Sequence, residues 1–467
     1  MIKSILKGST CLIAATLIAG AAHADGKVYG PQPVTLKGYT GDKTNSVAYS
    51  GQIARYVLHD SLKKLAGKGT GTYSADLEQQ MLAYFNGKDG SLPIIAPVGK
   101  DGFPVKQTTM GDLSSGANLA GKFYNGAMPA WPGNMTGQEV IAHMIKHASI
   151  AENGFDAENG YDWPQLVSKY TLGAVSYNQA VDNYLDEKMT ADNKPNNKPY
   201  GEGKHYTGKE HSWDEAFGYF GAAAHSATLS ADQNYAVAKM KDMAAADANS
   251  DGVVDLKTEY VFGNAYYAAG ADRSGVTNYM NTIVGAFVDG RNLITSANGE
   301  ALTADQIAEL QRLAGVIGDN WETVLAEAAF KYAGDVYNDI TKMQEAANDE
   351  ERAKIYRAYV KHWGELKGFA MSLQTGKNNL GETAVKMNRL IGFGPVTMDN
   401  TYVTGIDADG NFVRDRRRTW SDYQLHMLKL QKLLINDLGV KARAKDATGE
   451  LAGLADKLDS DANAETD

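Results

Sequence analysis

The segment DANSDGVVD at 247–255 spaces its oxygen donors as an EF-hand calcium loop does. Side-chain oxygens at loop positions 1, 3, 5 and 9 come from Asp247, Asn249, Asp251 and Asp255. Val253, at position 7, supplies its backbone carbonyl. Glycine at position 6 permits the sharp turn that such a loop needs. Because all of these ligands are hard oxygens, the pattern predicts a Ca²⁺ site.

The loop departs from the EF-hand pattern at its last ligand. Position 12 is Thr258, where a bidentate glutamate is usual, and the nearest carboxylate is Glu259, one residue later. Either a local bulge brings Glu259 to the cation, or the site lacks this ligand and binds calcium weakly. A metal-free alternative is an Asx-rich turn that caps the following helix. Helical patterns at 233–246 and 256–269 flank the loop.

Two histidine–glutamate pairs could bind a second metal, such as iron or another transition metal. His211 and Glu215 lie four residues apart and His362 and Glu365 three apart, so each pair can share a helix face and offer a nitrogen and an oxygen. A metal-dependent hydrolase would need at least three converging ligands, with a glutamate as general base. Alternatively, Ser212 caps a helix and Glu215 is its capping-box partner.

The two pairs lie in similar segments. The pattern W-x-E-x-x-G-aromatic occurs at 213–219 and again at 363–369. Such a repeat indicates two related helical halves.

Helical periodicity dominates the rest of the chain. Amphipathic helical patterns cover 50–65, 75–84, 163–189, 350–373 and 420–438. Capping patterns predict further helix starts at Thr136, Thr303 and Asp319. The glycine- and proline-rich segment 86–134 has little periodicity, and 401–413 alternates around Asp409-Gly410 as a small β-hairpin does.

The expected fold is therefore predominantly all-α, with two helical-bundle halves, a long irregular N-terminal segment and a small hairpin. The expected divisions are a signal peptide at 1–24, an extended leader at 25–45, a first helical half at 46–246, the calcium-type loop at 247–259, a second half at 260–443 and an acidic tail at 444–467.

The first 24 residues predict export. Lys3 and Lys7 precede an apolar stretch at 11–22, and Ala22-His23-Ala24 fits a signal-peptidase site. Cleavage would remove Cys11, the only cysteine, and so leave neither disulfides nor thiolate ligands. We expect the mature protein in the periplasm or outer envelope of a Gram-negative bacterium.

The formal net charge of −10 argues against nucleic acid as a partner, because phosphate backbones would be repelled. After the leader, no segment approaches the roughly 20 uninterrupted apolar residues of a membrane-spanning helix. Metal cations or small ligands, and an envelope protein, are the partners that remain.

Three segments carry a family resemblance: KHYTGKEHSWDEAFGYFG, DANSDGVVDLKTEYVFGNA and NWETVLAEAAFKYAGDVYNDI. They resemble a bacterial exported family known as domain of unknown function 4856. The all-α pattern is more loosely similar to imelysin-like, iron-regulated envelope proteins, whose G-x-H-x-x-E motif is matched at His362 and Glu365, with Val360 in place of the glycine. The resemblance implies an envelope location and a role in iron acquisition.

These observations together predict an exported, non-catalytic binding protein that carries a structural calcium loop and takes part in metal acquisition. A metal-dependent hydrolase that uses the histidine–glutamate pairs is one alternative. A structural envelope protein that docks a partner is the other.

Overall fold

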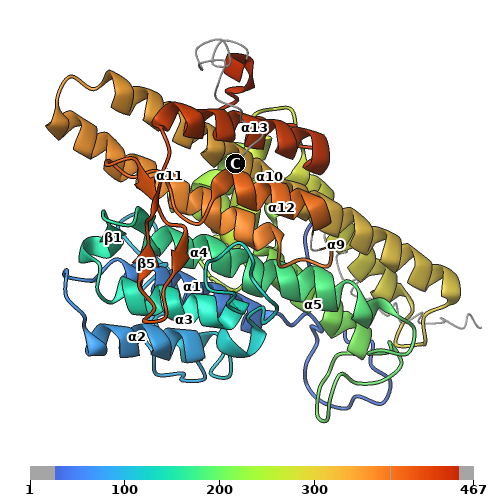
Figure 1. Ribbon diagram of the computed structural model, residues 1–467. Helices are drawn as coiled ribbons and strands as arrows, with labels where there is room; N and C mark the ends of the chain where they lie inside the picture. Colours follow the sequence, from blue (N-terminus) through green and yellow to red (C-terminus); the bar gives the residue numbers. More distant parts are fainter. Residues whose placement is uncertain (1–26, 379, 452–467) are drawn as a thin grey trace, which may run out of the picture.

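A computed structural model describes residues 27–378 and 380–451, so the predicted signal peptide and most of the acidic tail lie outside the described residues. The described part is built mainly of helices, as predicted (Figure 1). Its α-helices are α1 (Ser50–Ala66), α2 (Ala75–Asn86), α3 (Gly137–Ala148), α4 (Trp163–Thr171), α5 (Gly208–Phe220), α6 (Ala231–Ala238), α7 (Met243–Ala246), α8 (Gly263–Asp272), α9 (Tyr279–Ser296), α10 (Ala304–Glu345), α11 (Asp349–Leu373), α12 (Gly381–Ile391) and α13 (Trp420–Leu438).

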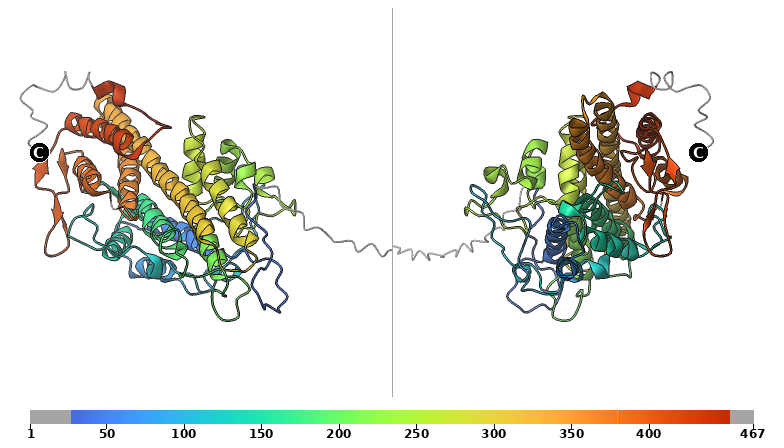
Figure 2. Two further views of the ribbon diagram at one scale, coloured as in Figure 1. Left: turned by 90° about the vertical axis from the view of Figure 1, so that its right-hand side faces the viewer. Right: turned by 60° about the vertical axis from the view of Figure 1, so that its left-hand side comes forward.

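The long helices α10 and α11 form the centre of one layer. They pack against each other along their length, with α13 and α9 beside α10 (Figures 1 and 2). Three residues join them, and the Asn348 side chain caps α11 by accepting a hydrogen bond from the Glu351 amide at 2.9 Å. Apolar side chains of α10 such as Trp321 and Phe330 are fully buried, which makes this pair part of the hydrophobic core.

A second layer contains α1 to α5, and α4 joins it to the first. α4 packs on α1 within its own layer and on α11 across the interface (Figure 1). It continues through two π-helical turns, Leu172–Tyr177 and Ala180–Tyr184, so the helix predicted at 163–189 is largely present. The core therefore lies between the two layers, and α4 is the helix of the second layer that packs on α11 of the first.

In both copies of the W-x-E-x-x-G motif, the glycine lies closely against a neighbouring segment. A Cβ on Gly218 of α5 would lie 2.8 Å from the Tyr49 Cβ beside α1, and one on Gly368 of α11 would lie 2.4 Å from the Lys169 Cβ on α4. Only glycine lets these helix backbones approach so closely. Trp213 and Trp363, the first residues of the two motifs, are both fully buried.

The irregular segment and the hairpin are both present as predicted. Residues 87–134 form no α-helix and contain two short 3₁₀ turns, Met110–Asp112 and Ala120–Lys122. Strands β4 (Gly405–Ile406) and β5 (Phe412–Val413) pair antiparallel. The remaining strands are β1 (Phe155–Asp156), β2 (Tyr161–Asp162), β3 (Thr401–Tyr402) and β6 (Arg416–Arg417), paired β1 with β2 and β3 with β6.

Two of the predicted helix starts are wrong. The helix predicted to begin after Ser212 begins one turn earlier, because Thr207 and Glu210 form the capping box and the Ser212 hydroxyl donates to the Gly208 carbonyl inside α5. Asp319 lies within the continuous helix α10, on its exposed face. The starts at Thr136 and Thr303 are confirmed by capping boxes.

Candidate functional site

The calcium-type loop has the turn geometry that its sequence predicts. The two carboxylate oxygens of Asp247 accept hydrogen bonds from the amides of Asp251 (3.1 Å) and Gly252 (2.9 Å). Asn249 Oδ1 accepts from the Asp251 amide at 2.8 Å, and Asp251 Oδ1 accepts from the Val253 amide at 3.1 Å. Gly252 has φ of 85°, the left-handed conformation that the sharp turn requires.

Glu259 turns toward this loop, whereas Asp255 turns away from it. Glu259 Oε2 accepts from the Asp255 amide at 2.8 Å. Burial raises the pKa of Glu259, and the negative charges of Asp247 and Asp251 raise it further. The Asp255 carboxylate instead lies 3.2 Å from Lys106 Nζ and accepts from the Gln107 amide group. Glu259, at position 13, thus approaches the loop, as the alternative with a local bulge requires.

The helix after the loop begins later than predicted. α7 leads into the loop, but α8 begins only at Gly263, so the predicted helix at 256–262 is wrong. Backbone pairing explains the difference, because Val254 exchanges hydrogen bonds with Pro104 and Lys106, and the chain then makes a turn in which the amides of Thr258 and Glu259 donate to the Asp255 carbonyl. Within residues 27–378 and 380–451, no three His, Cys, Asp or Glu side chains are grouped as metal ligands.

His211 and Glu215 face each other on α5. His211 Nε2 lies 3.8 Å from Glu215 Oε2, and the His211 ring packs against Tyr200 and Tyr206, each at 4.3 Å between ring centroids. Glu215 accepts a hydrogen bond from Gln52 of α1 at 2.8 Å. Burial lowers the pKa of His211, which favours its neutral form.

His362 and Glu365 have different partners, although both belong to α11. His362 Nδ1 lies 2.6 Å from an Asp339 carboxylate oxygen, while Glu365 pairs with Lys169 of α4 at 3.8 Å. The four predicted residues are therefore held in separate surroundings, and no converging ligand set for a hydrolase is found in the described part of the chain.

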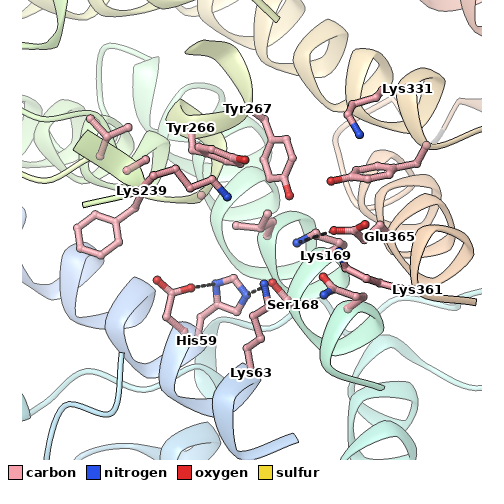
Figure 3. Close-up of a pocket in the computed structure, with 18 of the residues that line it drawn as sticks. His59, Lys63, Ser168, Lys169, Lys239, Tyr266, Tyr267, Lys331, Lys361 and Glu365 are labelled. Atoms are coloured by element: carbon pink, nitrogen blue, oxygen red, sulfur yellow. Dashed lines mark hydrogen bonds and ion pairs between the residues drawn. The ribbon is translucent and has the colours of Figure 1, made fainter. Parts of the chain in front are cut away.

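A pocket of about 390 Å³ lies between the two layers, and His362 and Glu365 are among the residues that line it (Figure 3). α1 and α4 form one wall, α10 and α11 another, and α8 with the end of α6 a third. Five lysines reach it, each from a different helix or helix end: Lys63, Lys169, Lys239, Lys331 and Lys361. The acidic residues that line the pocket are Asp60 and Glu365.

Lys63 and Lys169 are neighbours at the floor of this lysine pocket. Their amines are close enough to affect each other's protonation, and Lys169 is only 4% exposed. The positive charge of Lys169, together with burial, lowers the pKa of Lys63 to about 7. Burial also lowers the pKa of Lys169, but the Glu365 carboxylate opposes this shift and favours the Lys169 ammonium.

His59 and Asp60 stand beside this lysine pair on α1. His59 Nε2 lies 3.2 Å from the Ser168 hydroxyl, and burial lowers the pKa of His59 to about 3, so the ring is neutral. Burial raises the pKa of Asp60 to about 6, against the effect of the charge of Lys63. Asp60 can thus exchange a proton near neutral pH.

Tyrosine rings line the opposite side of the lysine pocket and hold its lysines in place. The Lys331 ammonium lies 4.0 Å from the Tyr332 ring centroid, and the Lys239 ammonium 4.6 Å from that of Tyr266. The Lys239 ammonium is held by this cation–π contact without being neutralised, whereas Lys331 also pairs with the Asp335 carboxylate at 2.5 Å. The pocket thus offers several N–H and O–H donors, and its lysines outnumber its acidic residues. Both properties suit an anionic ligand.

Together these features define a predominantly helical protein with a lysine-lined pocket between two layers. In the comparison with known families, residues 129–318 match the family described as "Domain of unknown function (DUF4856)", which confirms the resemblance noted in the sequence. The match includes the calcium-type loop and the pocket residues Lys169, Lys239 and Tyr267. A similarity to imelysin-like proteins is not shown.

No curated protein and no solved structure matches the chain. Among the described helices, none is both long enough and apolar enough to cross a membrane, in agreement with the sequence.

Proposed function

We propose that this protein is a non-catalytic binding protein that takes a small anion into the lysine pocket. The observation that supports the proposal most is the gathering of five lysines around one cavity in a chain whose formal net charge is −10. An acidic protein repels anions in general, so a local excess of positive charge marks the place where an anion is attracted.

The placement of the lysines supports binding over a purely structural role. Lys169 pairs with Glu365 inside the pocket, where both side chains are less than 10% exposed, and Lys331 pairs with Asp335, which does not line it. Lys239 and Lys361 are exposed at the rim, where their ammonium groups can meet a ligand from solvent. Burying Lys169 costs free energy, which a bound anion would offset.

Export and metal acquisition form a second part of the proposal. The support is the leader at 1–24 and the loose similarity to imelysin-like proteins noted in the sequence, from which the choice of iron comes. Iron measured in protein purified from the periplasm, and expression under iron limitation, test this part separately from anion binding.

A structural calcium ion is the third part. Asp247, Asn249 and Asp251 form the loop, and Glu259 approaches it from the following turn. A cation there would relieve the repulsion among these carboxylates and tie α7 to the turn that follows the loop.

Sulfate tests the anion-binding claim, because its charge does not change near neutral pH. We expect saturable binding in calorimetric titrations of the mature chain, and a loss of at least tenfold in affinity for the double substitution Lys331→Met, Lys361→Met. Lys354→Met is the matched control, since Lys354 is an exposed lysine of α11 paired with Glu350. Equal binding by both variants would argue against the lysine pocket as the binding site.

A further inference from the structure

We propose that Lys63 forms a reversible imine with the carbonyl carbon of a small carboxylate-bearing aldehyde or ketone, such as a 2-oxo acid. The inference rests on the proposed binding of anions in the lysine pocket and names the ligand class. It assigns Lys63 as a nucleophile, whereas the other lysines attract and orient the carboxylate.

The geometry distinguishes Lys63 from the other four lysines. It is half-buried on α1, faces the cavity and has the Lys169 ammonium as its immediate neighbour (Figure 3). Lys169 pairs with Glu365 at 3.8 Å, which favours the charged form of Lys169 next to Lys63. An amine beside a fixed cation, and partly removed from water, is the usual arrangement for a reactive lysine.

The charged groups around Lys63 shift its pKa in opposite directions, and the effect of the Lys169 ammonium is the larger. Asp60 on the same helix and Glu365 on α11 favour the Lys63 ammonium, while Lys169 on α4 disfavours it. His59 is neutral and adds no charge. The outcome is a pKa of about 7 for Lys63, so a large fraction of this amine is unprotonated at neutral pH.

The chemistry requires no oxidant, reductant or further reactant. The lone pair of the Lys63 nitrogen forms the new C–N bond while the carbonyl π electrons move to oxygen, and an amine proton passes to that oxygen. A second proton, for which Asp60 is the nearby acid, lets the hydroxyl depart as water while the nitrogen lone pair completes the C=N bond. The products are a protonated imine and one water molecule.

The remaining lysines explain why the carbonyl compound should carry a carboxylate. Lys239 and Lys331 approach the cavity from the sides opposite Lys63 (Figure 3). A carboxylate held between them would leave the neighbouring carbonyl group directed toward Lys63. Tyr267, whose hydroxyl also faces the cavity, can donate a hydrogen bond to the carbonyl oxygen.

The experiment compares pyruvate with lactate, which has the same carboxylate but a hydroxyl in place of the carbonyl. The mature chain is incubated with each at neutral pH and treated with cyanoborohydride, and the modified residue is located by peptide mass spectrometry. We expect one reduced adduct, at Lys63, with pyruvate and none with lactate. Lys63→Arg should lose the adduct, whereas Lys64→Arg, a change at the exposed neighbouring lysine, should retain it.

A positioning role for Lys169 gives a second readout. In Lys169→Met the cation is absent, so trapping at Lys63 should fall at least fivefold at neutral pH and recover when the pH is raised. Calorimetry with both acids separates the two claims. Binding of both without trapping at Lys63, or trapping spread over exposed lysines, overturns the imine and leaves anion binding intact. Binding of neither acid overturns the imine, and the sulfate titration then decides the anion-binding claim by itself.

Discussion

The Lys169 ammonium lies 3.8 Å from the Glu365 carboxylate, and both side chains are buried between α4 and α11. This pair connects the two layers at the floor of the lysine pocket. The sequence predicts Glu365 as a metal ligand, but its partner in the structure is a lysine. The pair therefore sets the charge of the pocket and contributes to the packing of its walls.

Replacing Glu365 by glutamine should destabilise the fold, because it leaves Lys169 as an uncompensated buried charge. We expect a loss of about 3 kcal/mol in the free energy of unfolding, measured with urea at neutral pH. Glu350→Gln is the control, since its pair with Lys354 on the same helix is more than 70% exposed and should contribute less than about 1 kcal/mol. Equal losses in the two variants would count against a buried pair.

Gly368→Ala should also destabilise the protein, through backbone spacing and not through charge. The added Cβ would lie 2.4 Å from the Lys169 Cβ, so α11 would have to move away from α4. We expect a cost of about 1–3 kcal/mol in thermal or urea unfolding. Gly315→Ala in α10, where no atom lies within 4 Å of the new Cβ, should be neutral or stabilising.

Sulfate affinity should rise as the pH falls from about 8.5 to about 6. The pKa of Lys63 is about 7 and that of Asp60 about 6, so acidification adds a positive charge and removes a negative one from the pocket. We expect roughly tenfold tighter binding at the lower pH, by calorimetry. Imine trapping should show the opposite trend, because it requires the unprotonated amine.

Lys63→Met provides the control for this pH dependence. Without Lys63 the rise in sulfate affinity should be confined to the range in which Asp60 titrates. An unchanged rise around pH 7 would mean that another group is responsible.

Calcium should raise the melting temperature of the mature chain, and a chelator should lower it again. Asp247→Asn and Asp251→Asn together remove two carboxylates from the loop while retaining their hydrogen-bond acceptors. This double variant should no longer respond to calcium. Asp89→Asn, in another exposed Asx turn, should respond as the wild type does. A calcium response that persists in the double variant would place the ion elsewhere.

The sequence predicted the helices well wherever an apolar stripe or a cap determined them. Trp420–Leu438 and the start after Thr303 are examples, because side chains close in sequence determine both. The prediction failed where contacts distant in sequence decide the outcome. The chain makes a turn after Asp255 and enters a helix only at Gly263, because Val254 pairs with residues near 105, which local propensity cannot reveal.

The lysine pocket was missed for a related reason. Its lysines lie on separate helices, and no spacing rule connects Lys63 with Lys169 or Lys331. One signal was available: Lys169 lies among apolar residues on the inner face of a predicted helix, next to Val167 and Tyr170, where a charged residue needs a partner. The repeated motif did identify Glu365, but the fold was needed to show what it faces.

Anion binding by the lysine pocket is tested most directly by calorimetric titration of the mature chain with sulfate, alongside the variant Lys331→Met, Lys361→Met. We predict one saturable site per chain in the wild type and at least a tenfold loss of affinity in the double variant. Absence of saturable binding, or equal affinity in both proteins, would contradict the proposed function.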